Sequence, residues 1–314
     1  MKIGGQAVIE GVMMKSDKKW SVAVRNTKGE ILVKDEPLTP LPKTLKLPII
    51  RGVVALYQAV TIGVKALNFS ASMAYDEEDS MSPLAIAATV VSSFILAVLL
   101  FILMPLYLTK VAGIYMSSIT DSSLIFNLVD GIIRVLVFLI YIILIGLWKE
   151  MSRVFEYHGA EHKVIYAYES GNGLTIDNIK KFSTLHPRCG TSFIFIVMIL
   201  SILVFSFIPK YWVFYEKFGS RVVLIPLIAG ISYEILKLSA KFQSNPIIRF
   251  LIKPGLMLQM LTTRQPSVDQ LEVALAALKQ VMVVDTEDAV VEDAVSKARR
   301  NICALESTSQ QGGK

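Results

Sequence analysis

All three histidines of this 314-residue chain fall within one stretch of 29 residues, at His158, His162 and His186. Imidazole is the most common side-chain metal ligand and exchanges protons near neutral pH. His158 and His162 are four residues apart, so on a helix both rings lie on one face and can bind one metal ion. The pattern therefore predicts a functional site in this part of the chain.

A glutamate and a cysteine add to the chemistry of this cluster. Glu161 belongs to a His-x-x-Glu-His pattern, the inverted form of a zinc-protease motif in which the glutamate activates a metal-bound water. Cys189 follows His186 by three residues. Histidine nitrogens and cysteine sulfur are ordinary zinc ligands, as a set of four or as three with a water. We predict that His158, His162, His186 and Cys189 bind a divalent metal, with zinc favoured, and that Glu161 is the catalytic general base.

Three further charged residues are candidates for supporting the site or contacting a substrate. Glu169 shares a helix face with His158, but eleven residues at about 1.5 Å each separate them by about 16 Å, too far to share one ion. Arg188 lies two residues after His186. Glu10 is a lone acid in an apolar strand flanked by glycines. Its carboxylate either faces solvent or reaches the histidine site.

The composition indicates a membrane protein. The chain is 53% hydrophobic and 18% charged, whereas soluble domains carry about 25% charged residues. The net charge of +6 comes without a run of basic residues that alternates with aromatics, so nucleic-acid binding is not predicted. Four apolar stretches come near the roughly 20 residues that cross a bilayer. They are Leu84–Thr109, Leu124–Leu147, Thr191–Ile208 and Val222–Leu238.

The distribution of basic residues predicts the orientation in the membrane. The loop at 148–190 contains six Lys and Arg residues, and the loop at 110–122 contains one. By the positive-inside rule, both termini and the histidine loop are cytoplasmic in a multi-pass protein of the cell membrane. The metal site would then lie at the cytoplasmic membrane surface. Cys189 and Cys303 are 114 residues apart, and no disulfide framework is predicted.

The predicted fold is a mainly α membrane protein with about four transmembrane helices and a small cytoplasmic α+β portion. An N-terminal β meander is expected from Ala7–Met14, Trp20–Val24 and Glu30–Val33, and Ser267 with Gln270 predicts a capping box at a later helix start. The predicted organisation is a β-rich segment at 1–50, an amphipathic interfacial helix with an acidic linker at 51–82, a four-helix membrane region at 83–245, cytoplasmic amphipathic helices at 246–306 and a disordered tail at 307–314.

Charged residues inside the predicted spans form a second group of candidates. Asp130 and Arg134 are four residues apart in the second span and can pair on one helix face, and Glu234 lies in the fourth span. Ionisable residues inside a membrane are costly and often functional. A structural ion pair within the bundle is the alternative explanation.

Several long motifs resemble the YqhQ-like family of bacterial membrane proteins, and the likeness extends from about Gly4 to Leu278. The resemblance implies a multispanning membrane protein of unknown function, described as a predicted metal-dependent enzyme. The motifs are Gly4-Gly5-Gln6-Ala7-Val8-Ile9-Glu10-Gly11-Val12-Met13-Met14, Arg51-Gly52, His158-Gly159-Ala160-Glu161-His162-Lys163 and His186-Pro187-Arg188-Cys189-Gly190-Thr191-Ser192.

Three functional hypotheses follow from these patterns. The first is a membrane-embedded metal-dependent hydrolase that acts on a lipid-linked or membrane-delivered substrate. The second is a non-enzymatic scaffold or adaptor, in which a structural His/Cys site stabilises a surface that recruits a cytoplasmic protein partner. The third is a transporter or channel whose path is lined by Asp130, Arg134 and Glu234. None of the motifs specifies an oligomeric state.

Overall fold

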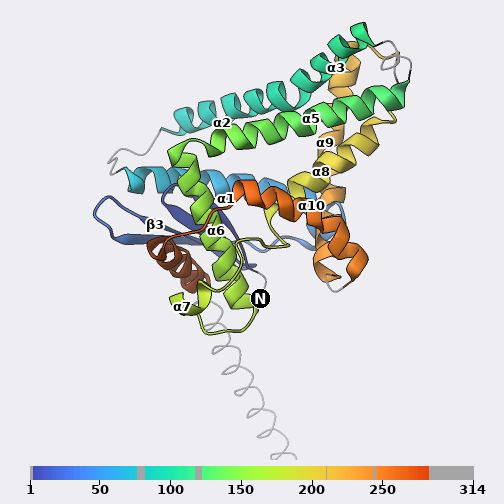
Figure 1. Cartoon of the computed structure of the whole chain (residues 1–314). Coiled ribbons are helices and arrows are strands. Elements are labelled where there is room, and N and C mark those ends of the chain that lie inside the picture. Colours follow the sequence, from blue (N-terminus) through green and yellow to red (C-terminus); the bar gives the residue numbers. More distant parts are fainter. Residues whose placement is uncertain (1–2, 76–81, 117–121, 210, 243–244, 283–314) are drawn as a thin grey trace, which may run out of the picture.

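The computed structural model describes residues 3–75, 82–116, 122–209, 211–242 and 245–282 (Figure 1). Within these ranges the chain is mainly helical and contains one small antiparallel sheet, so the predicted fold class is confirmed. Cys303, the predicted tail at 307–314 and the whole part of the predicted C-terminal helices beyond residue 282 lie outside the described residues.

The helical elements run from η1 to α10 along the chain, and residues 268–282 form a further helix. The bounds are η1 (Lys43–Lys46), α1 (Ile50–Ala74), α2 (Pro83–Val98), η2 (Leu99–Leu103), α3 (Met104–Tyr115), α5 (Ser123–Gly146), α6 (Lys149–Glu169), α7 (Ile176–Ile179), α8 (Gly190–Phe205), α9 (Phe214–Lys241) and α10 (Pro246–Thr262).

The predicted N-terminal meander is confirmed, with one strand more than expected. The four strands pair in sequence order, each antiparallel to the next. The segment Ala7–Met14 is a hairpin rather than one strand, and Glu10 lies in its turn with a φ of 49°. Gly11 permits this path, because a Cβ there would lie 2.3 Å from the carbonyl oxygen of Ala23. The strands are β1 (Gly4–Val8), β2 (Gly11–Lys15), β3 (Lys19–Arg25) and β4 (Ile31–Pro37).

The sheet is covered by helices on both faces, because successive side chains of a strand point to opposite sides. Val12 and Met14 pack into an apolar cluster with α6 and the 268–282 helix. Met13 and Val22 pack into a second cluster with Ile62 of α1. The sheet therefore holds α1 and α6 in fixed positions on its two sides.

The predicted number of spans agrees with the structure, although the set differs. The described helices that are long and apolar enough to cross a membrane are Ile50–Ala74, Leu84–Tyr115, Ser123–Gly146 and Phe214–Ser239. α8 is apolar but has only 16 residues, because the chain turns after Phe205. α1 satisfies the length criterion, yet it packs on the sheet and on α9, so its interfacial placement stays a prediction.

The strongest span, Leu84–Tyr115, has no buried residue in its most apolar window. Many apolar side chains in this window are exposed, which suits contact with lipid. Figure 1 shows α2, α3 and α5 extending away from the sheet, and α3 packs on α5. A π-helical turn, η2, joins α2 to α3 just before Pro105, which cannot donate a backbone hydrogen bond.

α6 leaves the membrane part after a break at Leu147 and Trp148 and packs on β1 and β2. α8 packs on α9 and α10. The predicted capping box is confirmed: the Gln270 N–H donates to Ser267 Oγ at 3.3 Å, and the Ser267 N–H donates to Gln270 Oε1 at 2.9 Å. The histidine motifs meet where α6, the start of α8 and the end of α10 converge.

Candidate metal centre

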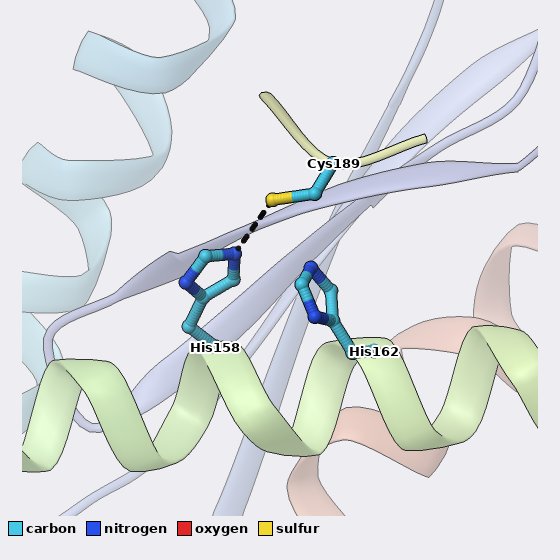
Figure 2. Close-up of side chains that lie close together, drawn as sticks. All are labelled: His158, His162 and Cys189. Carbon is cyan, nitrogen blue, oxygen red and sulfur yellow. Dashed lines mark hydrogen bonds between the residues drawn. The ribbon is translucent and has the colours of Figure 1, made fainter. Parts of the chain in front are cut away.

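Two histidines and one cysteine converge at this junction (Figure 2). His158 and His162 project from successive turns of α6 toward Cys189, which precedes α8. One ligand atom from each residue lies within 4.8 Å of the other two, and His158 Nε2 is 3.2 Å from Cys189 Sγ. Ligand atoms around a tetrahedral zinc ion are about 3.5 Å apart. The three residues are therefore near the spacing that a metal ion requires.

Backbone carbonyls fix the orientation of both imidazole rings. His158 Nδ1 donates to the carbonyl oxygen of Thr262 at 2.8 Å, and His162 Nδ1 donates to the carbonyl oxygen of Thr184. A carbonyl only accepts, so each Nδ1 carries the proton and each Nε2 presents a lone pair. Metal-binding histidines usually make this second hydrogen bond. His162 Nε2 is buried and has no hydrogen-bond partner among the described residues.

Cys189 is buried and caps the N-terminus of α8. The Thr191 N–H donates to Cys189 Sγ at 3.4 Å, and Thr191 Oγ1 lies 3.2 Å from the same sulfur. A helix N-terminus favours negative charge, and zinc binds cysteine as the thiolate. The surroundings of the sulfur therefore suit a metal ligand.

Gly159 allows a second chain segment to approach the histidine helix. A Cβ on Gly159 would lie 2.0 Å from the carbonyl oxygen of Arg264, so only glycine fits. The Arg264 N–H donates to the Phe155 carbonyl at 2.9 Å in the same crossing. This crossing places the Thr262 carbonyl against His158. Glycine has a low helix propensity, but at position 159 it allows the two chain segments to pack closely at the site.

Glu161 is buried beside the two histidines. Its Oε2 lies 3.6 Å from His162 Nε2 and 3.9 Å from His158 Nε2. Burial raises the pKa of the Glu161 carboxyl, and His158 opposes the rise by its charge. A carboxyl with a raised pKa is suited to accept and return a proton near neutral pH. Gly5 of β1 makes room for it, because a Cβ there would lie 2.7 Å from Glu161 Cγ.

His186, predicted as a ligand, lies beside this group with both nitrogens directed elsewhere. Its Nε2 is 3.3 Å from Glu169 Oε2, and its Nδ1 accepts from the Arg188 N–H at 3.3 Å. Glu169 also forms an ion pair with Arg188. The His186 ring centroid is 5.7 Å from that of His162, and burial lowers the His186 pKa, which favours the neutral ring. The predicted supporting residues Glu169 and Arg188 thus contact His186 rather than the three candidate ligands.

Gln259 of α10 anchors His186 and was not predicted from the sequence. Its Oε1 accepts from the His186 N–H and its Nε2 donates to the His186 carbonyl, each at 2.8 Å. Gln259 is completely buried. A polar side chain at a buried position of an otherwise apolar helix was the available sequence signal.

Glu10 lies at the hairpin turn and not at the histidine site. It forms an ion pair with Arg153 of α6, with 2.5 Å between Arg153 Nε and Glu10 Oε1, and the Tyr157 hydroxyl donates to it at 3.3 Å. The sharper expectation, that its carboxylate reaches the histidines, is corrected here. The turn that the sequence did not reveal directs Glu10 toward the earlier turns of α6.

The predicted pair of Asp130 and Arg134 is confirmed at 2.7 Å, and it is part of a larger buried group. Arg221 Nη1 donates to Asp130 Oδ1 at 2.8 Å, and Arg221 Nη2 donates to Asn127 at 3.1 Å. Arg134 also donates to Ser201 at 3.0 Å. The predicted fourth span begins at Val222 and leaves Arg221 outside it, whereas α9 begins at Phe214 and includes Arg221.

Glu234 belongs to a different contact. Arg51 Nε donates to Glu234 Oε1 at 2.6 Å, which ties the start of α1 to α9. Glu234 is thirteen residues beyond Arg221 on α9, a separation of about 20 Å along the helix. The described contacts therefore do not join Asp130, Arg134 and Glu234 into one path.

A cavity of about 740 Å³ opens from the histidine cluster toward α1. Glu161, His158 and Cys189 line one part of it. Apolar residues of α1 and α8 line much of the rest, including Leu56, Val60, Val64, Phe193 and Ile194. The cavity could therefore accommodate a ligand with a polar, reactive group beside the histidines and an apolar chain along α1.

Comparisons with known proteins agree with the predicted family resemblance. The family model described as "Protein of unknown function (DUF1385)" matches residues 47–284. The chain is 34% identical over 298 residues to "Uncharacterized protein YqhQ" of Bacillus subtilis (strain 168), which covers 89% of this chain and 92% of that protein. No solved structure matches the chain. The chain therefore belongs to the YqhQ-like DUF1385 family of proteins of unknown function.

Proposed function

We propose that the protein is a membrane-embedded, metal-dependent hydrolase that binds one divalent cation through His158, His162 and Cys189. The observation that carries this proposal is the buried His162 Nε2, which has no hydrogen-bond partner among the described residues. A buried polar atom without a partner costs free energy, and a cation would satisfy it together with the other two ligands. Imidazole and thiolate ligands favour zinc over magnesium or calcium.

The catalytic role that we propose for Glu161 follows from its position at the ligand group. Three protein ligands with one open position are the pattern of catalytic zinc sites. A divalent cation there supplies Lewis-acid chemistry. Glu161 would take the proton from the attacking water and return it to the leaving group. The carbonyls of Thr184 and Thr262 would hold the rings in place during both steps.

The substrate that we propose is delivered from the membrane. Its hydrolysable group would lie at Glu161, and its apolar chain would follow α1 and α8 in the 740 Å³ cavity. The basic loop at 148–190 favours a cytoplasmic location for the site and for both termini in the cell membrane.

Metal content tests the ligand set directly. We expect about one equivalent of zinc in detergent-purified wild type by inductively coupled plasma mass spectrometry, and loss of the metal in His158→Ala and Cys189→Ala. His186→Ala is the matched control, because its nitrogens bond to Glu169 and to the Arg188 N–H, and it should keep the metal. Folded wild type that takes up no divalent metal after resupply would exclude the proposed metal site.

A second experiment separates an enzyme from a structural metal site. If Glu161 is the base, Glu161→Gln keeps the metal and loses about 10²–10⁴-fold in the hydrolysis of chromogenic acyl-ester or phosphodiester probes in mixed micelles. Glu150→Gln, on the same helix and exposed, is the control. If Glu161 instead completes a closed four-ligand set, Glu161→Gln lowers the metal content, which favours the scaffold or adaptor hypothesis.

A further inference from the structure

A second cavity lies at the end of the membrane helices away from the sheet, where α3, α5 and α9 meet (Figure 1). Its volume is about 420 Å³, and its lining includes Lys110, Lys217, Leu106, Phe126 and Trp212. Lys217 Nζ lies 4.5 Å from the centroid of the Phe126 ring. Among the described residues, neither lysine has a carboxylate partner. The cavity thus combines two cationic side chains with apolar and aromatic walls.

The buried arginine group lies directly behind this cavity. Lys217 precedes Arg221 by four residues on α9, so both lie on one face of that helix. Phe126 of the cavity wall is next to Asn127, which accepts a hydrogen bond from Arg221. The cavity and the arginine group therefore form one continuous cationic region.

This region carries more positive than negative charge. The described side chains are Lys110, Lys217, Arg134 and Arg221 against Asp130, a surplus of three positive charges. The Nε atoms of both arginines are buried, and neither has a hydrogen-bond partner within the part of the chain that the structure describes. Glu216 does not line the cavity, is exposed and accepts from the Val213 N–H at 3.0 Å. Buried charge that is not balanced is costly, so the region suits an anion.

We propose that this cavity binds an anionic phosphoryl group. Lysines are common ligands of phosphoryl oxygens. The apolar walls formed by Leu106, Phe126 and Trp212 suit the organic part of such a ligand. The group comes either from a lipid head group or from free phosphate. This site is independent of the metal centre and of the proposed hydrolase activity.

Fluorescence of Trp212 provides a readout inside the cavity. The full chain in detergent is titrated with dihexanoyl phosphatidic acid and, separately, with inorganic phosphate, and a Trp212→Phe variant assigns the signal. We expect saturable binding of at least one probe to wild type. Lys110→Gln and Lys217→Gln should each weaken it about fivefold. Both lysines are at least partly exposed, so these variants should fold normally.

Lys241→Gln is the matched control, because Lys241 is also an α9 lysine near an aromatic ring, 5.5 Å from the Phe242 centroid, and does not line the cavity. It should bind like wild type. Two results together would identify a lipid head group as the ligand. Phosphatidic acid would bind more tightly than phosphate, and native mass spectrometry would find co-purified anionic lipid in wild type but not in the double lysine variant. Comparable or tighter binding of phosphate without retained lipid identifies a free anion. No Trp212 response to either probe, or equal affinities in wild type and both lysine variants, would overturn the proposal.

Discussion

The histidine cluster and the arginine cluster are both buried polar groups, but they leave opposite kinds of atoms without partners. Among the described residues, the histidine cluster leaves His162 Nε2 without a partner, and this atom is an acceptor because Nδ1 of the same ring donates to a carbonyl. Within the same described ranges, the arginine cluster leaves the Nε–H donors of Arg134 and Arg221 without partners. Unpartnered acceptors call for a cation and unpartnered donors for an anion.

The two regions also differ in what holds them. Backbone carbonyls orient the histidines, so the side chains are fixed while their lone pairs stay free. In the arginine group, Asp130 gives one carboxylate oxygen to each arginine, so the carboxylate is fully used in joining α5 to α9. The first arrangement suits a reactive site, and the second suits a structural core with surplus charge at its edge.

Asp130→Asn should have the largest effect on stability. It leaves two buried guanidinium groups without a carboxylate, and breaking a buried pair costs about 3–5 kcal/mol. Unfolding in detergent micelles measures the loss, with the exposed Asp177→Asn as control. A variant that keeps its stability but loses ion flux in liposomes would contradict the structural role and support the transporter hypothesis.

Removal of the proposed metal ion should have the next largest effect. A ligand that binds only the folded state stabilises it by about 4 kcal/mol at a free concentration 1,000 times its Kd. We expect a chelator to lower the Tm of wild type and of His186→Ala, and to leave that of His162→Ala unchanged. A chelator effect of equal size in His162→Ala would place the metal elsewhere.

The spacing of the histidines placed two of the three candidate metal ligands, and the contacts decided the rest. The interval of four residues placed His158 and His162 on one helix face, and α6 confirms that. His186 and Cys189 lie in the same short motif, only three residues apart. Sequence spacing therefore cannot tell which of them directs a ligand atom toward His158 and His162. The ion pair of Glu169 with Arg188, formed across a turn, holds His186 outside the group.

The same limit applies to the membrane part. Hydropathy identified the apolar helices, because lipid contact requires apolar residues whatever the packing. It could not identify Arg221 as a partner of Asp130, because a buried arginine that is paired inside a bundle looks like a loop residue in the sequence. The polar residues of α1 led to the prediction of an interfacial helix. In the structure, the apolar side of α1 packs on the sheet.

Gly5→Ala should separate the base from the metal ligands. The added Cβ would lie 2.7 Å from Glu161 Cγ and 2.9 Å from the Met13 carbonyl, so Glu161 must shift. Overpacking of this kind costs about 1–3 kcal/mol. We expect reduced hydrolysis with normal metal content. Gly4→Ala is the matched control, since nothing lies within 4 Å of its Cβ position, and equal effects of both substitutions would show that the contact with Glu161 is unimportant.

Loss of the exposed ion pair between Glu36 and Lys65 should have the smallest effect on stability. This pair tests whether burial determines how much a charged group contributes to stability. Their atoms are 2.9 Å apart, and the hydrogen bond from Lys65 lowers the pKa of Glu36 below its usual value of 4.5. The folded state therefore gains stability above about pH 4.5 and loses it as the pH falls through the lowered pKa. An exposed pair contributes less than about 1 kcal/mol.

A double-mutant cycle with Glu36→Gln and Lys65→Gln measures this coupling. We expect the coupling at pH 7 in low salt, with a marked decrease in high salt and as the pH falls through the lowered pKa of Glu36. The loss of stability caused by Asp130→Asn should be as large in high salt as in low salt, because solvent ions do not screen a buried group. If the coupling free energy of the exposed pair were as large as the loss of stability in Asp130→Asn, burial would not determine the free-energy cost of breaking an ion pair. The unpartnered buried nitrogens would then no longer identify the sites that need a ligand.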